Sequence, residues 1–368
     1  MDSVQCCFGQ LRPGRSGWVQ YYRLMPVTRN DVARAAGVSS AVVSYVVNGG
    51  PRPVSAATRQ RVLDAIDQLG YRRDSVARSM RTGTTDSIGL ILPDIGLSYF
   101  AVMTQRVTDI ARQRGLSVMV ATSNGRADLE RDHLLEMAGR RVDGVILMSV
   151  HPQDELGTAE ALGIPVLLVD RPSVAVNGMV TITEHLIDHG LSQVARMAPP
   201  PGYAISPRRE VGWRRALEQR GLDPSTARIA QSDISEPAGY HAGRTLLDGD
   251  DPPEGIVVDS GPQAMGLLRA AADLGVRVPE DLAVIAMEAG VVADYTVPRL
   301  SSMDSPIEEI AAEALAAIAT APRRNGLLTL SGTAFSLHLR ESCGHLESSP
   351  ALGPMPTAQP YPESGGGT

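Results

Sequence analysis

The segment from Thr28 to Asn48 constrains the fold of this chain more than any other part of the sequence. Thr28 followed three residues later by Asp31 has the spacing of a capping box, in which the two side chains begin a helix. Gly37 permits a sharp turn because glycine adopts backbone angles that other residues avoid, and Ser39 stands where it can cap a second helix. The pattern predicts a helix-turn-helix, a motif whose second helix enters the major groove of DNA.

Apolar residues recur in this region at the spacing of helices that pack on one another. In the two short helices, the positions expected to face inward are Val32, Ala33, Ala36, Val42, Val43, Val46 and Val47. A third helix is predicted over residues 57–69, followed by Gly70 as its C-terminal cap. Its expected inward positions are Val62, Leu63, Ile66 and Leu69. From the residues alone, a helical hairpin in an ordinary core remains the alternative.

The motif resembles the DNA-binding headpiece of the lactose repressor (LacI/GalR) family. The matching residues are Asp31-Val32-Ala33, Ala36-Gly37-Val38-Ser39, Val43-Ser44 and Asn48. The resemblance implies contacts to the DNA backbone at Thr28, Ser39, Ser44, Asn48, Ser55, Thr58 and Tyr71. It places Ser40, Ala41 and Tyr45 opposite the base edges. Tyr45 stands where the family often has an arginine, which argues against guanine readout at that position.

The headpiece is expected over 26–71 and a linker over 72–84. Residues 74–81 resemble the hinge helix of the family, which is too short to be stable alone and orders against DNA. Ala77 and Met80 would contact DNA there, Met80 in place of the usual leucine wedge. A plain polar linker is the alternative.

Both ends of the chain lack periodicity. We expect residues 1–25 to be disordered or a misassigned extension, because Met25 immediately precedes the start of the motif. A basic arm that touches DNA is the alternative. Residues 346–368 are rich in proline, serine and glycine, and we expect a disordered tail.

Charge is unevenly distributed along the chain. The total is −7, yet residues 26–83 hold nine arginines and four aspartates, a net charge of +5, which leaves −12 for the remainder. A basic head on an acidic body is expected when one domain alone faces phosphate. No apolar run approaches a membrane span, no signal peptide is recognisable, and three cysteines without metal-ligand spacing fit a reducing cytoplasm.

The sequence offers little that would support catalysis or a cofactor. It contains no lysine, which excludes a P-loop or Schiff-base lysine, and it contains no nucleophile elbow. His185 and His189 are four residues apart, but without a third ligand nearby we expect a solvated or capping role. We therefore predict neither an enzyme, nor a cofactor, nor a metal site.

After residue 85 the sequence pattern is that of alternating strands and helices, which predicts βαβ units. Strands are expected at 88–92, 116–121, 142–147, 165–169, 193–197, 255–259, 282–287 and 334–339. Helices are expected at 99–114, 127–139, 179–189, 208–220, 237–247, 262–274 and 306–319. The region 85–345 resembles the family's periplasmic-binding-protein-like core of two doubly wound parallel-sheet subdomains. Subdomain 1 is expected at about 85–173 with 303–331, and subdomain 2 at about 174–302 with 332–345.

The resemblance places an effector site in the cleft between the two sheets, at the carboxyl ends of the strands. The matching positions are Asp94, Tyr99, Phe100, Asp170, Arg209, Ser260 and Glu288. Arg209 is suited to grip a carboxylate, a phosphate or a sugar hydroxyl, and Tyr99-Phe100 to stack on a ring. A scaffold role is the alternative for each of these residues.

Several positions depart from the family pattern in this cleft. Leu97-Ser98 stands where the family usually has Asn-Pro, Val174-Ala175 and Ser260-Gly261 replace the pairs Asp-Asn and Asn-Asp, and Glu288 replaces an aspartate. Each lost hydrogen bond would forfeit roughly 1 kcal/mol of binding, so the pattern argues against a simple sugar.

The function expected is a sequence-specific transcriptional regulator, most often a repressor in this family. It would bind a palindromic DNA operator as a homodimer and respond to a small polar effector. The alternatives are a regulator with a vestigial pocket, controlled by a protein partner or by nothing, a solute-binding module, and an enzyme on the same scaffold. The effector, the operator and the regulated genes stay open.

Overall fold

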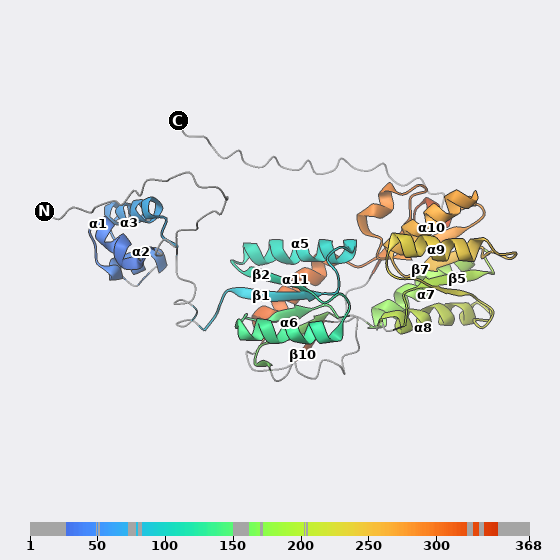
Figure 1. The fold of residues 1–368 in the computed structure, drawn as a ribbon, viewed down its shortest axis with the longest axis horizontal. Helices are drawn as coiled ribbons and strands as arrows, with labels where there is room; N and C mark the ends of the chain where they lie inside the picture. The colour runs from blue at the N-terminus through green and yellow to red at the C-terminus, as the bar shows by residue number, and fades with distance from the viewer. Residues whose placement is uncertain are drawn as a thin grey trace, which may run out of the picture. The chain divides into compact units, whose positions relative to one another are not determined.

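The computed structural model shows two compact units, Met1–Ala77 and Arg78–Thr368, and Figure 1 draws the elements of each. The residues it describes are 27–48, 50, 52–72, 79, 83–149, 162–169, 172–201, 203, 205–321, 327–330 and 335–344. The predicted terminal segments 1–25 and 346–368 lie outside the described residues, as do Ala77 and Met80 of the predicted hinge helix.

The headpiece is a unit of three helices, α1 (Arg29–Ala36), α2 (Ser40–Asn48) and α3 (Ala56–Leu69). Gly37 and Gly70 adopt left-handed backbone angles and end α1 and α3, as predicted. The buried core of the unit consists of Val32, Ala33, Ala36, Val43, Val46, Val62 and Ala65. Each short helix buries only part of its surface, so the three helices depend on one another for stability.

Three apolar positions predicted to face inward do not. Leu63 is 40% exposed and Leu69 is 37% exposed, whereas Ala65 takes the inward place on α3. Val42 is half-buried and lies outside the headpiece core. The helical spacing is compatible with two adjacent faces of α3, and the face that carries Ala65 is the one that belongs to the headpiece core.

The first sheet of the larger unit has five parallel strands in the order β10-β4-β3-β1-β2. The strands are β1 (Ser87–Leu92), β2 (Ser117–Thr122), β3 (Val145–Leu147), β4 (Val166–Val169) and β10 (Leu327–Leu330). The helices around it are α5 (Ser98–Gln113), α6 (Ala127–Gly139) and α11 (Ile307–Thr320). Helices α5 and α11 pack on one face of the sheet and α6 on the other.

The second sheet has six strands in the order β11-β9-β8-β7-β5-β6, and only β11 runs antiparallel to its neighbour. The strands are β5 (Val194–Ala198), β6 (Ile229–Gln231), β7 (Gly255–Val258), β8 (Ala283–Met287), β9 (Ser301–Asp304) and β11 (Ser336–His338). The helices are α7 (Pro172–Asp188), α8 (Ile205–Gln219), α9 (Glu236–Leu247) and α10 (Gly261–Leu274), with short turns η3 (Gly290–Tyr295) and η4 (Glu341–Cys343).

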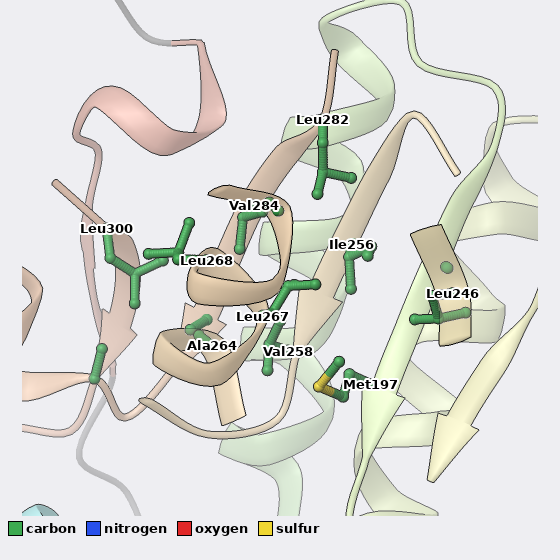
Figure 2. Packing of buried hydrophobic residues seen from close by; sticks show 14 of the residues in the cluster. Met197, Leu246, Ile256, Val258, Ala264, Leu267, Leu268, Leu282, Val284 and Leu300 are labelled. Atoms are coloured by element: carbon green, nitrogen blue, oxygen red, sulfur yellow. The ribbon is translucent and has the colours of Figure 1, made fainter. Parts of the chain in front are cut away.

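Side chains of the second sheet alternate between two cores, as strand geometry requires. Residues Ile256, Val258 and Val284 belong to the cluster that contains α10, and Figure 2 shows Leu267 and Leu268 of that helix packed over these strands. The other face of the sheet packs against α7 and α8. The sheet is therefore covered on both faces.

The structure differs from the predicted elements in several places. Strands β6, β9 and β10 were not predicted, because each has only three or four residues and no strong apolar run. Helix α7 begins at Pro172 rather than 179. The expected subdomain boundaries at 173/174 and 302/303 therefore fall inside α7 and β9 rather than between elements.

Candidate DNA-binding surface and ligand cleft

Each headpiece helix begins with a hydroxyl side chain that caps it. Thr28 Oγ1 accepts a hydrogen bond from the Asp31 amide at 3.4 Å, while the Thr28 amide donates to Asp31 Oδ2 at 2.9 Å. Ser39 and Ser55 each accept a first-turn amide at 3.3 Å. Helix N-termini carry free amide donors and the positive end of the helix dipole, which favour phosphate. The three caps thus stand at positions suited to the DNA backbone.

The residues matched to the family's DNA contacts differ in exposure. Those that are exposed are Thr28, Ser39, Ala41 and Ser55, and those that are half-buried are Ser40, Ser44, Tyr45, Thr58 and Tyr71. Tyr71 packs against the headpiece core, so part of its role is structural. The side chain of Asn48 lies outside what the structure describes.

Sequence reasoning did not identify Gly50 as a residue that supports Tyr45. A β-carbon on Gly50 would lie 2.2 Å from the Tyr45 Cδ1 and 3.1 Å from its Cα. The Gly50 amide also donates to the Tyr45 carbonyl at 3.1 Å. The bare backbone of Gly50 therefore fixes the ring of the largest residue expected to face base edges.

The described arginines of the headpiece all lie at its surface. They are Arg29, Arg34, Arg52, Arg59, Arg61 and Arg72, and each is exposed. Solvent-exposed guanidinium groups on a small helical unit provide the positive potential that attracts DNA phosphates.

A cavity of about 380 Å³ opens between the two sheets of the larger unit. Six of the seven predicted effector residues line it, namely Asp94, Tyr99, Phe100, Arg209, Ser260 and Glu288. The seventh, Asp170, lies outside the described residues. The volume is in the range of pockets that bind small molecules, and the lining combines apolar side chains with a few charged groups.

Arg209 is the most deeply buried charged residue among the predicted effector positions. It comes from α8 and is 8% exposed. Its Nη1 donates to the main-chain carbonyl of Asp259 at 2.5 Å and lies 3.9 Å from Asp259 Oδ2. Its Nε is buried and has no hydrogen-bond partner among the described residues. A buried guanidinium with an unused donor is suited to an acceptor group on a ligand.

Asp259 and Arg196 form a buried ion pair that the sequence did not indicate. Asp259 lines the cavity next to Ser260, while Arg196 is fully buried on β5. Arg196 Nε donates to Asp259 Oδ1 at 2.9 Å and Nη2 donates to Oδ2 at 2.7 Å. An arginine in a short apolar strand gives no signal of its partner, which lies 63 residues away.

Glu288 lines the cavity at the carboxyl end of β8 in the second sheet. It follows β8 with a left-handed φ of 55°. Its Oε2 accepts the Ser305 amide at 3.2 Å and its Oε1 accepts the Ser305 hydroxyl. Burial raises the pKa of Glu288, while hydrogen bonds from Ser305 and the charge of Arg209 oppose the rise.

The remaining predicted residues have clear structural partners. Ser260 caps α10 through the Gln263 amide at 3.4 Å, so its hydroxyl serves the helix as well as the cavity wall. Tyr99 and Phe100 meet edge to face at 5.1 Å and pack against the first core. Asp94 accepts the Gly96 amide at 2.7 Å.

Tyr203 and Asp233 also line the cavity and were not predicted. Burial first, and then the carboxylates of Asp233 and Asp94, raise the pKa of the Tyr203 phenol. Both residues lie in loops that follow short strands, and the sequence carries no pattern that marks such loop positions.

His185, for which a solvated or capping role was expected, is half-buried in the last turn of α7. Its Nε2 lies 3.3 Å from the Sγ of buried Cys343. In the part of the chain that the structure describes, no group of three or more His, Cys, Asp or Glu residues is arranged to hold a metal ion. Within the same residues, no helix is long and apolar enough to cross a membrane.

Comparison with known proteins matches both units. The family model for bacterial regulatory proteins of the lacI family matches residues 28–74, and the model for periplasmic binding protein-like domains matches residues 183–343. The chain is 33% identical over 303 residues to catabolite control protein A of Priestia megaterium, which covers 79% of this chain and 91% of that protein. It is 32% identical over 295 residues to the ribose operon repressor of Halalkalibacterium halodurans, covering 77% and 87%.

Solved structures match the same architecture. A lac repressor dimer bound to operator and the anti-inducer ONPF superimposes with a TM-score of 0.75 at 24% identity, covering 86% of this chain and 99% of that chain. The transcriptional regulator CelR in complex with cellobiose gives a TM-score of 0.60 at 28% identity, with the same coverage. The chain belongs to the lacI family of bacterial regulatory proteins and is a DNA-binding transcriptional regulator.

Proposed function

We propose that the protein binds a palindromic double-stranded DNA operator as a homodimer in the cytoplasm, and that a small polar molecule in the cleft modulates this binding. The headpiece supports the DNA part, because its capped helix N-termini and exposed arginines suit phosphate. Repression is the mode named for the ribose operon relative, and we propose it for this protein.

The homodimer follows from the size of the headpiece. One recognition helix reads only a short half-site, so two headpieces must act together, and two-fold symmetry in the protein requires symmetry in the operator. The lac repressor structure that shares this fold is a dimer on its operator. Residues Ala77 and Met80 of the predicted hinge would contact the minor groove between the half-sites.

The proposal that a ligand binds in the cleft rests on Arg209. This residue lines a cavity of about 380 Å³, and its Nε is buried and has no hydrogen-bond partner among the described residues. A buried donor without a partner costs free energy that a ligand acceptor would recover. Ser260 and Glu288 are already engaged, by Gln263 and Ser305 respectively, so few groups remain to fix the hydroxyls of a simple sugar. A vestigial pocket, with control by a protein partner, is the second candidate.

The DNA part is tested by selecting random duplexes on the full chain and mapping the enriched sequence. We expect an inverted repeat. Selection of no sequence over random DNA would contradict the proposed function.

The ligand part is tested by thermal-shift screening against sugars, nucleosides and organic acids, followed by titration of operator binding with each compound that stabilises the protein. We expect a compound that changes operator affinity in the wild type and not in Arg209→Ala. Tight binding of a sugar that survives Arg209→Ala would contradict the role of Arg209. If no compound stabilises the protein, the vestigial pocket becomes the better account.

A further inference from the structure

Arg196 lies on the face of the second sheet that packs against α7 and α8. Its strand neighbours Ala195 and Met197 belong to the cluster around α10, and Figure 2 shows Met197 on that side. Met197 and Arg196 are consecutive on β5, so they point to opposite faces. Arg196 is thereby directed under the N-terminal turns of α8, the helix that carries Arg209.

Arg196 uses its donors to hold two segments of the cavity wall. Besides the two hydrogen bonds to Asp259, its Nη2 donates to the Ser206 carbonyl at 2.9 Å and lies 3.3 Å from the Ser206 Oγ. Its Nη1 has no hydrogen bond and lies 3.6 Å from Glu210 Oε2. Both oxygens of Asp259 are therefore occupied by one guanidinium at hydrogen-bond distance.

Asp259 is also the nearest carboxylate to Arg209. Among the described residues it is the only acidic side chain within 4 Å of the Arg209 guanidinium, at 3.9 Å. The attraction between two charges grows steeply when they leave water, so a buried carboxylate without another partner would pair with Arg209 directly. Arg196 prevents that pairing because it neutralises Asp259 with shorter, bidentate bonds.

The other charged groups around Arg209 do not replace Asp259. Glu288 bonds to Ser305 through both carboxylate oxygens. Asp94 and Asp233 line the same cavity but are exposed to solvent, which screens their charges. Arg208 is a second arginine in the lining.

We infer that Arg196, which does not touch the ligand, selects an anionic ligand for the cleft by occupying Asp259 and so leaving Arg209 to bind a carboxylate or a phosphate ester. This inference rests on the proposed function, in which the cleft binds a small molecule through Arg209. Arg196 is a specificity-determining residue in this account.

The inference is tested by titrating the full chain with inorganic phosphate at constant ionic strength, with glucose as the neutral control. The readout is the fluorescence of Trp213, which lies four residues after Arg209 on the same helix. The N-terminal Trp18 is replaced by Phe in every protein compared. We expect the wild type to bind phosphate and Arg209→Ala to lose that binding at least tenfold.

Arg196→Met keeps an unbranched, apolar stem and removes the guanidinium with its charge. It should weaken phosphate binding at least tenfold, because Asp259 then pairs with Arg209. The double variant Arg196→Met/Asp259→Asn should regain affinity to within about threefold of the wild type, since the competing carboxylate is gone. A purely structural role of Arg196 would leave the double variant as weak as the single one.

Asp259→Asn alone provides a check that does not depend on the folding of Arg196→Met. It should bind phosphate at least as tightly as the wild type, because a nearby negative charge is removed. Three results would each overturn the inference. They are an equal phosphate affinity in Arg196→Met and wild type, a loss of phosphate binding in Asp259→Asn, and a wild type that does not bind phosphate. If the wild type ignores phosphate but binds glucose through Arg209, the proposed function stands while the inference fails.

Discussion

Tyr45 and Gly50 are in direct contact at the end of the recognition helix. A β-carbon on Gly50 would approach the Tyr45 Cδ1 to 2.2 Å, and it would also lie 3.1 Å from the Tyr45 Cα. A side chain at position 50 cannot be accommodated by a rotation of the ring alone, because the backbone of Tyr45 is also close.

Gly50→Ala should therefore weaken operator binding by displacing Tyr45. We expect a loss of roughly tenfold in affinity, the equivalent of about 1.4 kcal/mol, measured by fluorescence anisotropy on the selected operator. Gly139→Ala is the matched control, because a β-carbon there meets nothing within 4 Å. An unchanged operator affinity for Gly50→Ala would show that Tyr45 does not depend on this contact.

Tyr45 itself should determine sequence preference rather than general affinity. Replacing it by Ala should change the bases enriched at one position of each half-site, since base contacts specify the sequence and phosphate contacts only position the protein. Repeating the duplex selection with the variant measures this. A uniform loss of binding to all DNA would instead assign Tyr45 to the backbone.

Thr28→Ala should destabilise the first headpiece helix by about 1 kcal/mol, the usual cost of removing an N-terminal cap. Hydrogen bonds from Thr28 also hold the pKa of Asp31 below its usual value, and the variant should bring that pKa back up. Hydrogen exchange at the α1 amides reports the stability, and Thr28→Ser is the control that keeps the cap. If the α1 amides of Thr28→Ala exchange as slowly as those of the wild type, the cap has no stabilising role.

Glu288 should make stability depend on pH. Burial raises the pKa of Glu288 above the ordinary glutamate value of 4.5, so the folded protein holds this proton more tightly than the unfolded chain does. The contribution of this proton to the free energy of unfolding is fully present below about pH 4.5 and is lost as the pH rises through the pKa of Glu288 in the folded protein. Thermal unfolding of Glu288→Gln and wild type across this range should show the variant gaining relative stability with rising pH. A constant difference would contradict the buried position of this carboxyl.

The headpiece could be predicted closely because its signals are local. The capping residues Thr28 and Ser55 and the terminating glycines Gly37 and Gly70 act within a few residues of their own positions. The inward positions Leu63 and Leu69 were wrong, because helical spacing alone does not decide which of two adjacent faces meets the partner helix.

The cleft could be predicted only through the resemblance. Residues such as Arg209 and Glu288 matched family positions, and the structure brings them to one cavity. The Arg196–Asp259 pair was missed because its two residues lie 63 positions apart, and a single sequence does not indicate which buried charges pair with each other. The loop residues Tyr203 and Asp233 were missed because the sequence carries no pattern that marks such loop positions.

The most direct test of the central claim is the binding of the full chain to its selected operator, compared with a duplex that contains one half-site. The account predicts two chains per operator, binding to the half-site that is at least a hundredfold weaker, and a logarithm of affinity that falls linearly with the logarithm of salt concentration. Binding of one chain per operator, with the same affinity for the half-site, would contradict dimeric operator binding. An affinity that does not change with salt concentration would contradict binding through phosphate contacts.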